Sequence, residues 1–205
     1  MESIEHFLAL PEEKQHKIID AGLGCFGKNG YKKASVSDIA KAAGISKAMI
    51  FYYFGNKKNM YLYLSDFCVK FLAEGVIGGL NTNETDFFER IKIISTAKLS
   101  ISEQYPDVMT FIESVYFETD SEVENEIKQL TAQRSDIYNL QKFFEGVDYS
   151  KFKSGINPAL VIKLLTRFTE GYIREKSGWG NVNKAEFMRE FDECLMLFKN
   201  NFYKK

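Results

Sequence analysis

The sequence predicts an all-α chain of about nine helices, and three observations support that fold class. Apolar residues recur at the 3.6-residue spacing of an amphipathic helix along most of the 205 residues. Several of these stretches begin with a residue type that caps helix N-termini. Only three prolines occur, and no dense glycine and proline punctuation separates short alternating segments, which argues against an all-β fold.

Composition limits the classes of protein that this chain can be. A hydrophobic fraction of 45% with 27% charged residues is that of a soluble globular protein. No signal peptide and no apolar run long enough to span a bilayer is present, so we expect a cytoplasmic protein without a membrane partner. The three cysteines lie far apart without C-x-x-C spacing, and the two histidines complete no ligand set with them. We therefore expect no metal and no cofactor.

Charge is distributed unevenly along the chain. Residues 1–60 hold nine lysines and six acidic residues, a net charge of +3, whereas the remaining residues hold 18 basic and 22 acidic side chains, a net charge of −4. This asymmetry favours an N-terminal module that faces a polyanion and a C-terminal module that does not.

The first long helix is expected to begin at Pro11, after a short helical lead-in or a frayed arm over residues 1–10. Its apolar face runs as far as Gly30. Gly22, Gly24 and Gly27 lie inside this helix, where each costs about 1 kcal/mol relative to alanine. We interpret these glycines as positions where a neighbouring helix approaches closely.

Two short capped helices follow. Ser35 caps the first, and Gly44 occupies the position just past its end, where positive φ is needed. Ser46 caps the second, Lys47–Phe54, and Gly55 ends it. Two short helices joined by a tight turn form a helix-turn-helix, whose second helix enters the DNA major groove. An ordinary helical hairpin is the alternative, but exposed tyrosines and lysines on the second helix favour phosphate contacts.

This stretch resembles the DNA-binding signature of the TetR/AcrR family of bacterial repressors. The match begins upstream and covers about the first quarter of the chain. The matching residues are Ile18-Ile19-Asp20-Ala21, Phe26, Gly30-Tyr31, Asp38-Ile39-Ala40, Ala43-Gly44-Ile45-Ser46-Lys47, Ile50-Phe51-Tyr52-Tyr53-Phe54 and Lys57-Lys58. The resemblance implies a helix-turn-helix DNA-binding domain over residues 1–56 and a helical ligand-binding and dimerisation domain over residues 57–205.

The expected DNA contacts follow from this match. They are Ser35, Ser37, Lys47, Ala48, Met49, Phe51, Tyr52, Tyr53 and Lys57. Residues 1–60 contain no arginine, the residue that most often reads guanine, so Lys47 is the expected hydrogen-bonding base reader. Phe51 either contacts a thymine methyl or packs beneath the helix, whereas Phe54 is expected to pack.

Six more helices are predicted after the helix-turn-helix. The first runs from about Lys57 to Glu74, after which Gly75, Gly78 and Gly79 are expected to loosen the chain. The others run from Glu84 to about Gln104, from Pro106 onward, from Asp120 or Ser121 to Phe144, from Pro158 onward and from about Lys184 onward. Asn157 is the expected cap of the helix that begins at Pro158.

The resemblance also implies a cavity for an unknown small-molecule effector among the middle helices. The aromatic content of 15% fits an apolar pocket with a few polar groups. Candidate walls are Phe67, Phe71, Met109, Ile112, Tyr116 and Phe168. Candidate polar anchors are Lys98, Glu113, Arg134, Tyr138 and Gln141. For each apolar candidate the alternative is core packing, and for each charged one it is a solvated position.

One helix-turn-helix makes too few contacts for strong specificity, and dimers solve this by spanning two half-sites about 34–36 Å apart. The resemblance implies a homodimer through the last two helices on a palindromic double-stranded DNA operator, released when the effector binds. Repression is the family default, and the residues leave activation open. An enzyme is disfavoured because no pair of E-x-x-H motifs, no H-x-E and no glycine-rich phosphate loop occurs. A helical adaptor that binds only proteins is the third reading.

Overall fold

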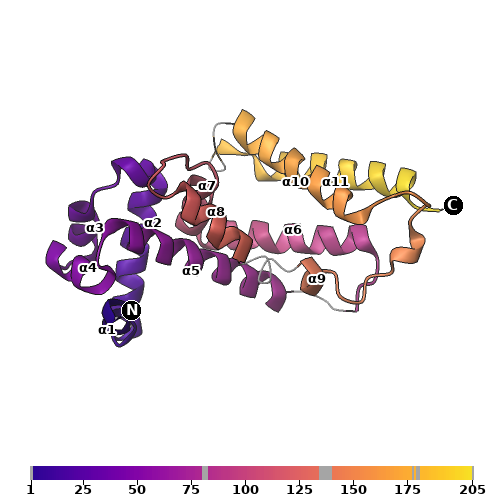
Figure 1. Cartoon of the computed structure of the whole chain (residues 1–205). Coiled ribbons are helices and arrows are strands. Elements are labelled where there is room, and N and C mark those ends of the chain that lie inside the picture. Colours follow the sequence, from indigo (N-terminus) through magenta and orange to yellow (C-terminus); the bar gives the residue numbers. More distant parts are fainter. Residues whose placement is uncertain (1, 80–82, 134–139, 177, 179–180, 205) are drawn as a thin grey trace. The chain divides into compact units, whose positions relative to one another are not determined.

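A computed structural model describes residues 2–79, 83–133, 140–176, 178 and 181–204 of the chain (Figure 1). The described residues are mainly helical and contain no strand, which confirms the all-α fold class. The helices are α1 (Glu2–Leu8), α2 (Glu12–Lys33), α3 (Val36–Ala43), α4 (Lys47–Phe54), α5 (Lys57–Gly78), α6 (Phe87–Gln104), α7 (Pro106–Tyr116), α8 (Glu124–Gln133), α9 (Leu140–Phe143), the 3₁₀ helix η2 (Tyr149–Lys151), α10 (Pro158–Glu175) and α11 (Lys184–Phe202).

The chain divides into two compact units, each built from two separate stretches. The first unit comprises Met1–Ala73 and Gln104–Tyr138, and the second comprises Glu74–Glu103 and Asn139–Lys205. The predicted boundary at residue 56, between a DNA-binding and a ligand-binding domain, is not a boundary between these units and stays a prediction.

Two glycines let neighbouring helices pack closely against α2 in the first unit. A Cβ built on Gly22 would lie 2.6 Å from Leu64 Cδ1, and one built on Gly27 would lie 3.2 Å from the backbone nitrogen of Phe111. Leu64 and Phe111 are both fully buried. The helices α5 and α7 therefore approach α2 at positions where a side chain would force a neighbour to shift, which is the role the sequence predicted for these glycines.

The second unit is held together by an aromatic cluster at the start of α6. The rings of Phe87 and Phe152 lie 5.1 Å apart, as do those of Phe152 and Tyr203, and Tyr203 also contacts Phe88 at 5.2 Å. Backbone hydrogen bonds from Lys153 N to Phe202 O and from Lys204 N to Lys151 O flank the cluster. The stretch after α11 is thus joined to the loop that follows η2.

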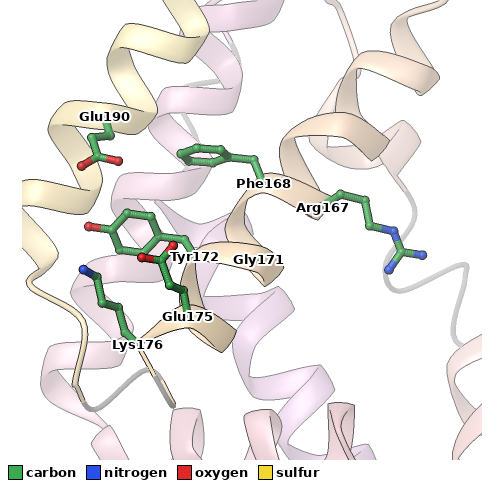
Figure 2. A pocket seen from close by; sticks show the side chains of 7 residues that line it. All are labelled: Arg167, Phe168, Gly171, Tyr172, Glu175, Lys176 and Glu190. Atoms are coloured by element: carbon green, nitrogen blue, oxygen red, sulfur yellow. The ribbon is translucent and has the colours of Figure 1, made fainter.

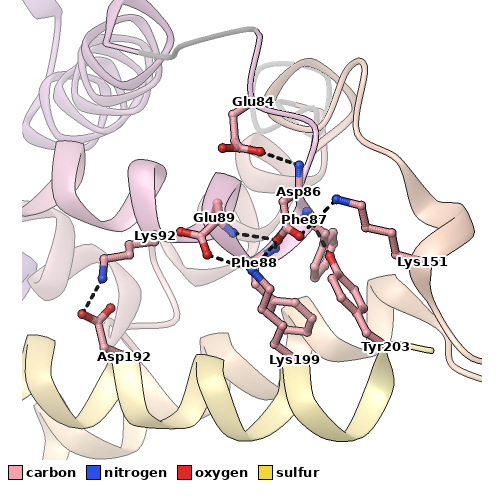
Figure 3. A network of polar contacts seen from close by, with 10 residues as sticks. All are labelled: Glu84, Asp86, Phe87, Phe88, Glu89, Lys92, Lys151, Asp192, Lys199 and Tyr203. Atoms are coloured by element: carbon pink, nitrogen blue, oxygen red, sulfur yellow. Dashed lines mark hydrogen bonds and ion pairs between the residues drawn. The ribbon is translucent and has the colours of Figure 1, made fainter. Parts of the chain in front are cut away.

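Charged groups tie the same region to α11 (Figure 3). One carboxylate oxygen of Asp86 accepts hydrogen bonds from the backbone N–H groups of Phe88 and Glu89, and so caps α6. The ammonium groups of Lys151 and Lys199 each lie 3.3 Å from this carboxylate. Lys92 pairs with Asp192 at 2.7 Å and adds a second link between α6 and α11.

The helices α10 and α11 run side by side (Figure 1) and bury aromatic rings between them. Tyr172 contacts Phe187 at 5.1 Å, and Phe168 lies 6.4 Å from Phe187 and 6.2 Å from Phe191. The cap at Asn157, whose side chain accepts a hydrogen bond from Ala159 N, starts α10 as the sequence predicts.

After the helix-turn-helix, the helix boundaries differ from the sequence prediction in three places. Helix α5 continues through Gly75 to Gly78 instead of ending near Glu74, because Gly75 packs against Ile101, to which a built Cβ would be 2.8 Å. Helix α6 begins at Phe87 rather than Glu84, since Asp86 supplies its cap. The single helix predicted from residue 120 to 144 contains α8 and α9, and residues 134–139 between them lie outside the described residues.

No described helix is both long and apolar enough to cross a membrane.

Candidate nucleic-acid interface

The reading head, defined here as residues 35–55, consists of two short helices with defined ends. Ser35 accepts a hydrogen bond from Asp38 N at 3.4 Å and caps α3. Gly44 adopts φ 70°, a left-handed conformation that glycine adopts without strain. Ser46 accepts from Met49 N at 3.3 Å and caps α4, and Gly55, at φ 76°, follows its end. Each of these signals was predicted from the sequence.

The inner faces of both helices are buried in the core of the first unit. Ile39 and Ile50 are fully buried, and Phe54 is 3% exposed. These side chains fix the rotation of α4 about its own axis. Because that rotation is fixed, the residues on the opposite face of α4 are presented to solvent.

Four of the predicted DNA contacts lie on this outer face of α4. Lys47, Ala48, Phe51 and Tyr52 are exposed. The Lys47 ammonium lies 5.7 Å from the centroid of the Phe51 ring, within the range of a cation–π contact. Phe51 is 38% exposed, which favours a role at the surface over packing beneath the helix.

The other predicted DNA contacts differ in accessibility. Ser37 is exposed near the start of α3, Ser35 is half-buried at the cap, and Met49 is half-buried on α4. Tyr53 is only 6% exposed, and its ring packs against Phe7 of α1 at 6.1 Å. Tyr53 therefore contributes mainly to the core, and a phosphate contact by its hydroxyl stays a prediction.

Lys57 makes contacts within the chain. Its ammonium donates to the carbonyl oxygen of Lys32 at 3.2 Å and lies 4.6 Å from the centroid of the Tyr31 ring. Lys58, the next residue, pairs with Glu126 on α8. The start of α5 is thus fastened both to the end of α2 and to α8.

A break near the end of α2 places the residues that precede α3. Gly30 adopts φ 68°, which interrupts the helix, and the backbone N–H of Tyr31 then donates to a carboxylate oxygen of Glu118 at 2.9 Å. Burial, followed by a hydrogen bond to Glu122, raises the pKa of Tyr31 above the ordinary tyrosine value, so the phenol stays neutral. The acidic segment after α7 therefore supports the base of the reading head.

The predicted effector residues are divided between the two units. Phe67, Phe71, Met109, Ile112, Glu113 and Tyr116 belong to the first unit, and Lys98, Gln141 and Phe168 belong to the second. Phe67 and Phe71 stack at 6.1 Å, whereas Tyr116 is 53% exposed. Arg134 and Tyr138 lie outside the described residues, as does the side chain of Gln141. The effector site stays a prediction.

A shallow pocket of about 400 Å³ opens beside α10 in the second unit (Figure 2). It is lined by Arg167, Phe168, Gly171, Tyr172, Glu175, Lys176 and Glu190. Phe168 is the one predicted effector residue in this lining. The charged groups around its rim come from both α10 and α11, and sequence spacing within one helix could not indicate that grouping.

The structure also reveals two contributors to the interface region that the sequence did not indicate. His6 of α1 stacks on Tyr52, with ring centroids 4.8 Å apart and an interplanar angle of 19°. Glu118 accepts from Tyr31 across 87 positions of sequence. Neither contact follows from local periodicity, because each depends on packing between helices that are separate in sequence.

Comparison with known proteins identifies this interface. The model of a family described as bacterial regulatory proteins, tetR family, matches residues 18–64, which include the whole reading head. The biofilm operon icaADBC negative transcriptional regulator IcaR of Staphylococcus aureus strain Newman is 22% identical over 182 residues, 89% of this chain and 97% of that protein. IcaR of Staphylococcus epidermidis is 20% identical with the same coverage.

Solved structures share the fold along most of the chain. The fatty acid degradation regulator FadR of Bacillus halodurans has a TM-score of 0.67 at 20% identity, covering 88% of this chain and 96% of that one. A TetR family transcription regulator of Marinobacter aquaeolei has a TM-score of 0.60 at 14% identity, covering 95% and 97%. The family match falls on the capped helix-turn-helix, and the solved structures share the fold along nearly the whole chain, so residues 18–64 form a DNA-binding domain of the kind found in the tetR family of bacterial regulatory proteins.

Proposed function

We propose that this chain is a repressor that binds a palindromic operator as a homodimer in the cytoplasm and leaves it when a small molecule binds. The observation that carries the DNA-binding part is the outer face of α4. There, Lys47, Phe51 and Tyr52 are exposed on a helix whose opposite face is locked into the core. A helix held in this way presents a fixed set of groups to base edges and phosphates.

Negative regulation is supported by the relatives. IcaR, which matches this chain over most of its length, is named as a negative transcriptional regulator of its operon. A repressor needs only to occupy its operator, whereas an activator also needs a surface for the transcription machinery.

The dimer proposal rests on exposed apolar side chains of the last two helices. Leu160 and Leu164 on α10 are 53% and 46% exposed, and Met196 and Leu197 on α11 are 63% and 59% exposed. Apolar groups gathered on one pair of helices are typical of a surface that a partner covers. A second copy of the same chain would bury them in a four-helix arrangement.

Effector control would work by linkage. A ligand that binds better when the two reading heads are wrongly spaced for the operator lowers DNA affinity by the same factor by which DNA lowers ligand affinity. Helix α5, which runs from Lys57 at the edge of the reading head into the second unit, is the proposed connection. Titration of a verified ligand at fixed salt must weaken operator binding if this is right.

The DNA-binding part is tested by measuring the affinity of purified protein for the DNA upstream of its gene and for a random duplex. Replacing Lys47 with alanine should weaken operator binding by roughly tenfold and leave random DNA nearly unaffected, because a base contact discriminates by about 1–3 kcal/mol. Replacing Lys57 should weaken both duplexes to a similar extent, as expected for a phosphate contact.

Lys70→Ala is the matched control. This lysine lies on α5, where it pairs with Asp66, and its replacement should change neither affinity. A wild-type protein that shows no preference for the upstream DNA over the random duplex in any salt would refute the proposed function.

A further inference from the structure

A buried ring of α1 packs against the recognition helix. Phe7 is fully buried, and its ring contacts those of Phe54 at 5.0 Å, Tyr63 at 5.4 Å and Tyr53 at 6.1 Å. Three aromatic partners from α4 and α5 therefore hold this short helix in place.

Carbonyl groups at the end of α1 also accept hydrogen bonds from a side chain of α2. The side-chain amide of Gln15 donates to the carbonyl oxygens of Leu8 at 3.1 Å and Leu10 at 2.8 Å. Helix C-termini leave carbonyl groups without partners inside the helix, and a side chain that meets them stabilises the end. Both observations indicate that α1 has a defined position beside α4.

This position places His6 on the outer side of the recognition helix. The His6 ring stacks on that of Tyr52 at 4.8 Å, and both residues are exposed, Tyr52 by 51%. Tyr52 is one of the proposed phosphate contacts. The imidazole has at least one N–H group, and side-chain donors of this kind bind the phosphate oxygens of DNA.

We propose that His6 is a further DNA contact, which donates a ring N–H to the sugar-phosphate backbone next to the phosphate that Tyr52 meets. The stack has a second effect, because it restricts the Tyr52 ring to one orientation before DNA arrives and so lowers the ordering cost of binding. Helix α1 then belongs to the interface together with α3 and α4. This inference rests on the proposed function of α4.

Two variants separate the donor from the stack. His6→Phe keeps an aromatic ring against Tyr52 but removes the N–H group, and His6→Ala removes both. We expect His6→Phe to weaken binding of operator and random duplex alike by about tenfold or more, since one hydrogen bond to a charged group is lost. His6→Ala should weaken both further, because it also removes the stack on Tyr52.

A third variant is designed to restore the contact. His6→Lys supplies a cation at the same place, so its affinity should return to that of the wild type or exceed it. The slope of log affinity against log salt should also become steeper by about 0.9, the value for one more phosphate contact. A steeper slope would show that position 6 lies beside the phosphate backbone, whereas an unchanged slope would place it away from the DNA and overturn the proposal.

His16→Ala is the matched control, because His16 is the only other histidine and lies exposed on α2. It should bind both duplexes like the wild type. The proposal is overturned if His6→Phe binds like the wild type, or if its loss is confined to the operator, which would indicate a base contact. Wild-type and Lys47→Ala protein are measured in the same experiment. They test the proposed DNA binding itself, so a failure of that proposal is distinguished from a failure of the His6 proposal.

Discussion

At the scale of single residues, the glycines of α2 have distinct environments although the sequence presents them alike. A Cβ on Gly22 would overlap the buried Leu64, whereas one on Gly24 would meet only Asp107 Oδ2 at 3.9 Å, an ordinary contact distance. Gly22 therefore makes room for a neighbour, and Gly24 has no such requirement.

We expect opposite effects from the two alanine substitutions. Gly24→Ala should raise the free energy of unfolding by about 0.5–1 kcal/mol through helix propensity. Gly22→Ala should lower it by about 1–2 kcal/mol, because overpacking against Leu64 and Met60 outweighs that gain. Urea unfolding measures both values, and equal effects from the two variants would contradict the assigned contact.

The sequence indicated which side of α4 faces solvent, but not how deeply each of its residues is buried. The burial of Phe54 follows from the helical period, and the period also leaves Lys47 and Tyr52 outside. Tyr53 is buried because Phe7 packs against it, and Phe7 comes from α1, where the sequence predicted either a short helical lead-in or a frayed arm. Whether such a residue is buried depends on a packing partner that is distant in the sequence.

At the scale of helices, the helix starts that have a capping side chain were predictable from the sequence. Ser35, Ser46 and Asn157 each accept the hydrogen bond that a capping residue is expected to accept. The end of α5 was not predictable, since the three glycines that suggested a break include one that packs against Ile101. A glycine signals a helix end or a close contact equally well, and only the neighbour distinguishes them.

The cap of α6 makes the stability of the protein depend on pH, because the capping group is the carboxylate of Asp86. Burial pushes the pKa of Asp86 upward, but the Glu89 N–H and the ammonium groups of Lys199 and Lys151 together outweigh it and hold the pKa below the ordinary aspartate value. A carboxyl group of lowered pKa stabilises the folded state above its unfolded pKa, and this contribution is lost as pH falls through the folded pKa.

Replacing Asp86 with asparagine should therefore destabilise the protein near neutral pH and less so in acid. The gap in unfolding free energy between wild type and Asp86→Asn should narrow as pH falls from about 5 to about 2. Glu145→Gln, which removes an exposed carboxylate, is the control, and its unfolding free energy should stay close to that of the wild type. A gap for Asp86→Asn that widened in acid would exclude the assigned contacts.

At the scale of the whole molecule, the family fold was predictable because its signature is concentrated in one short stretch. The effector site was not, since its candidate residues belong to two packed units and some lie outside the described residues. Packing between distant segments determines which side chains share a cavity, and a helical period contains no such information.

The proposed dimer leads to a prediction at the same scale. Leu164→Glu combined with Leu197→Glu places two charges on the exposed face of α10 and α11, where burial against a partner would be costly. Sedimentation should show monomers at concentrations where the wild type is dimeric, and operator affinity should fall by more than tenfold while the helical content stays unchanged.

Ile77→Glu provides the comparison for this pair. Ile77 is 40% exposed on α5, outside the proposed dimer surface. The Ile77→Glu substitution should therefore leave the dimer intact. If the double variant remains dimeric, a different surface mediates assembly.

The passage of α5 through the boundary of the two units has a practical consequence for dissecting the protein. The division falls between Ala73 and Glu74, inside one continuous helix, and each unit also needs a second stretch of chain from further along. No single cut yields either unit, and a cut within α5 would leave four amide and four carbonyl groups without helical partners. A truncated clone of the DNA-binding half must therefore carry residues 104–138 as well, rejoined by a designed connection, if it is to keep its native core.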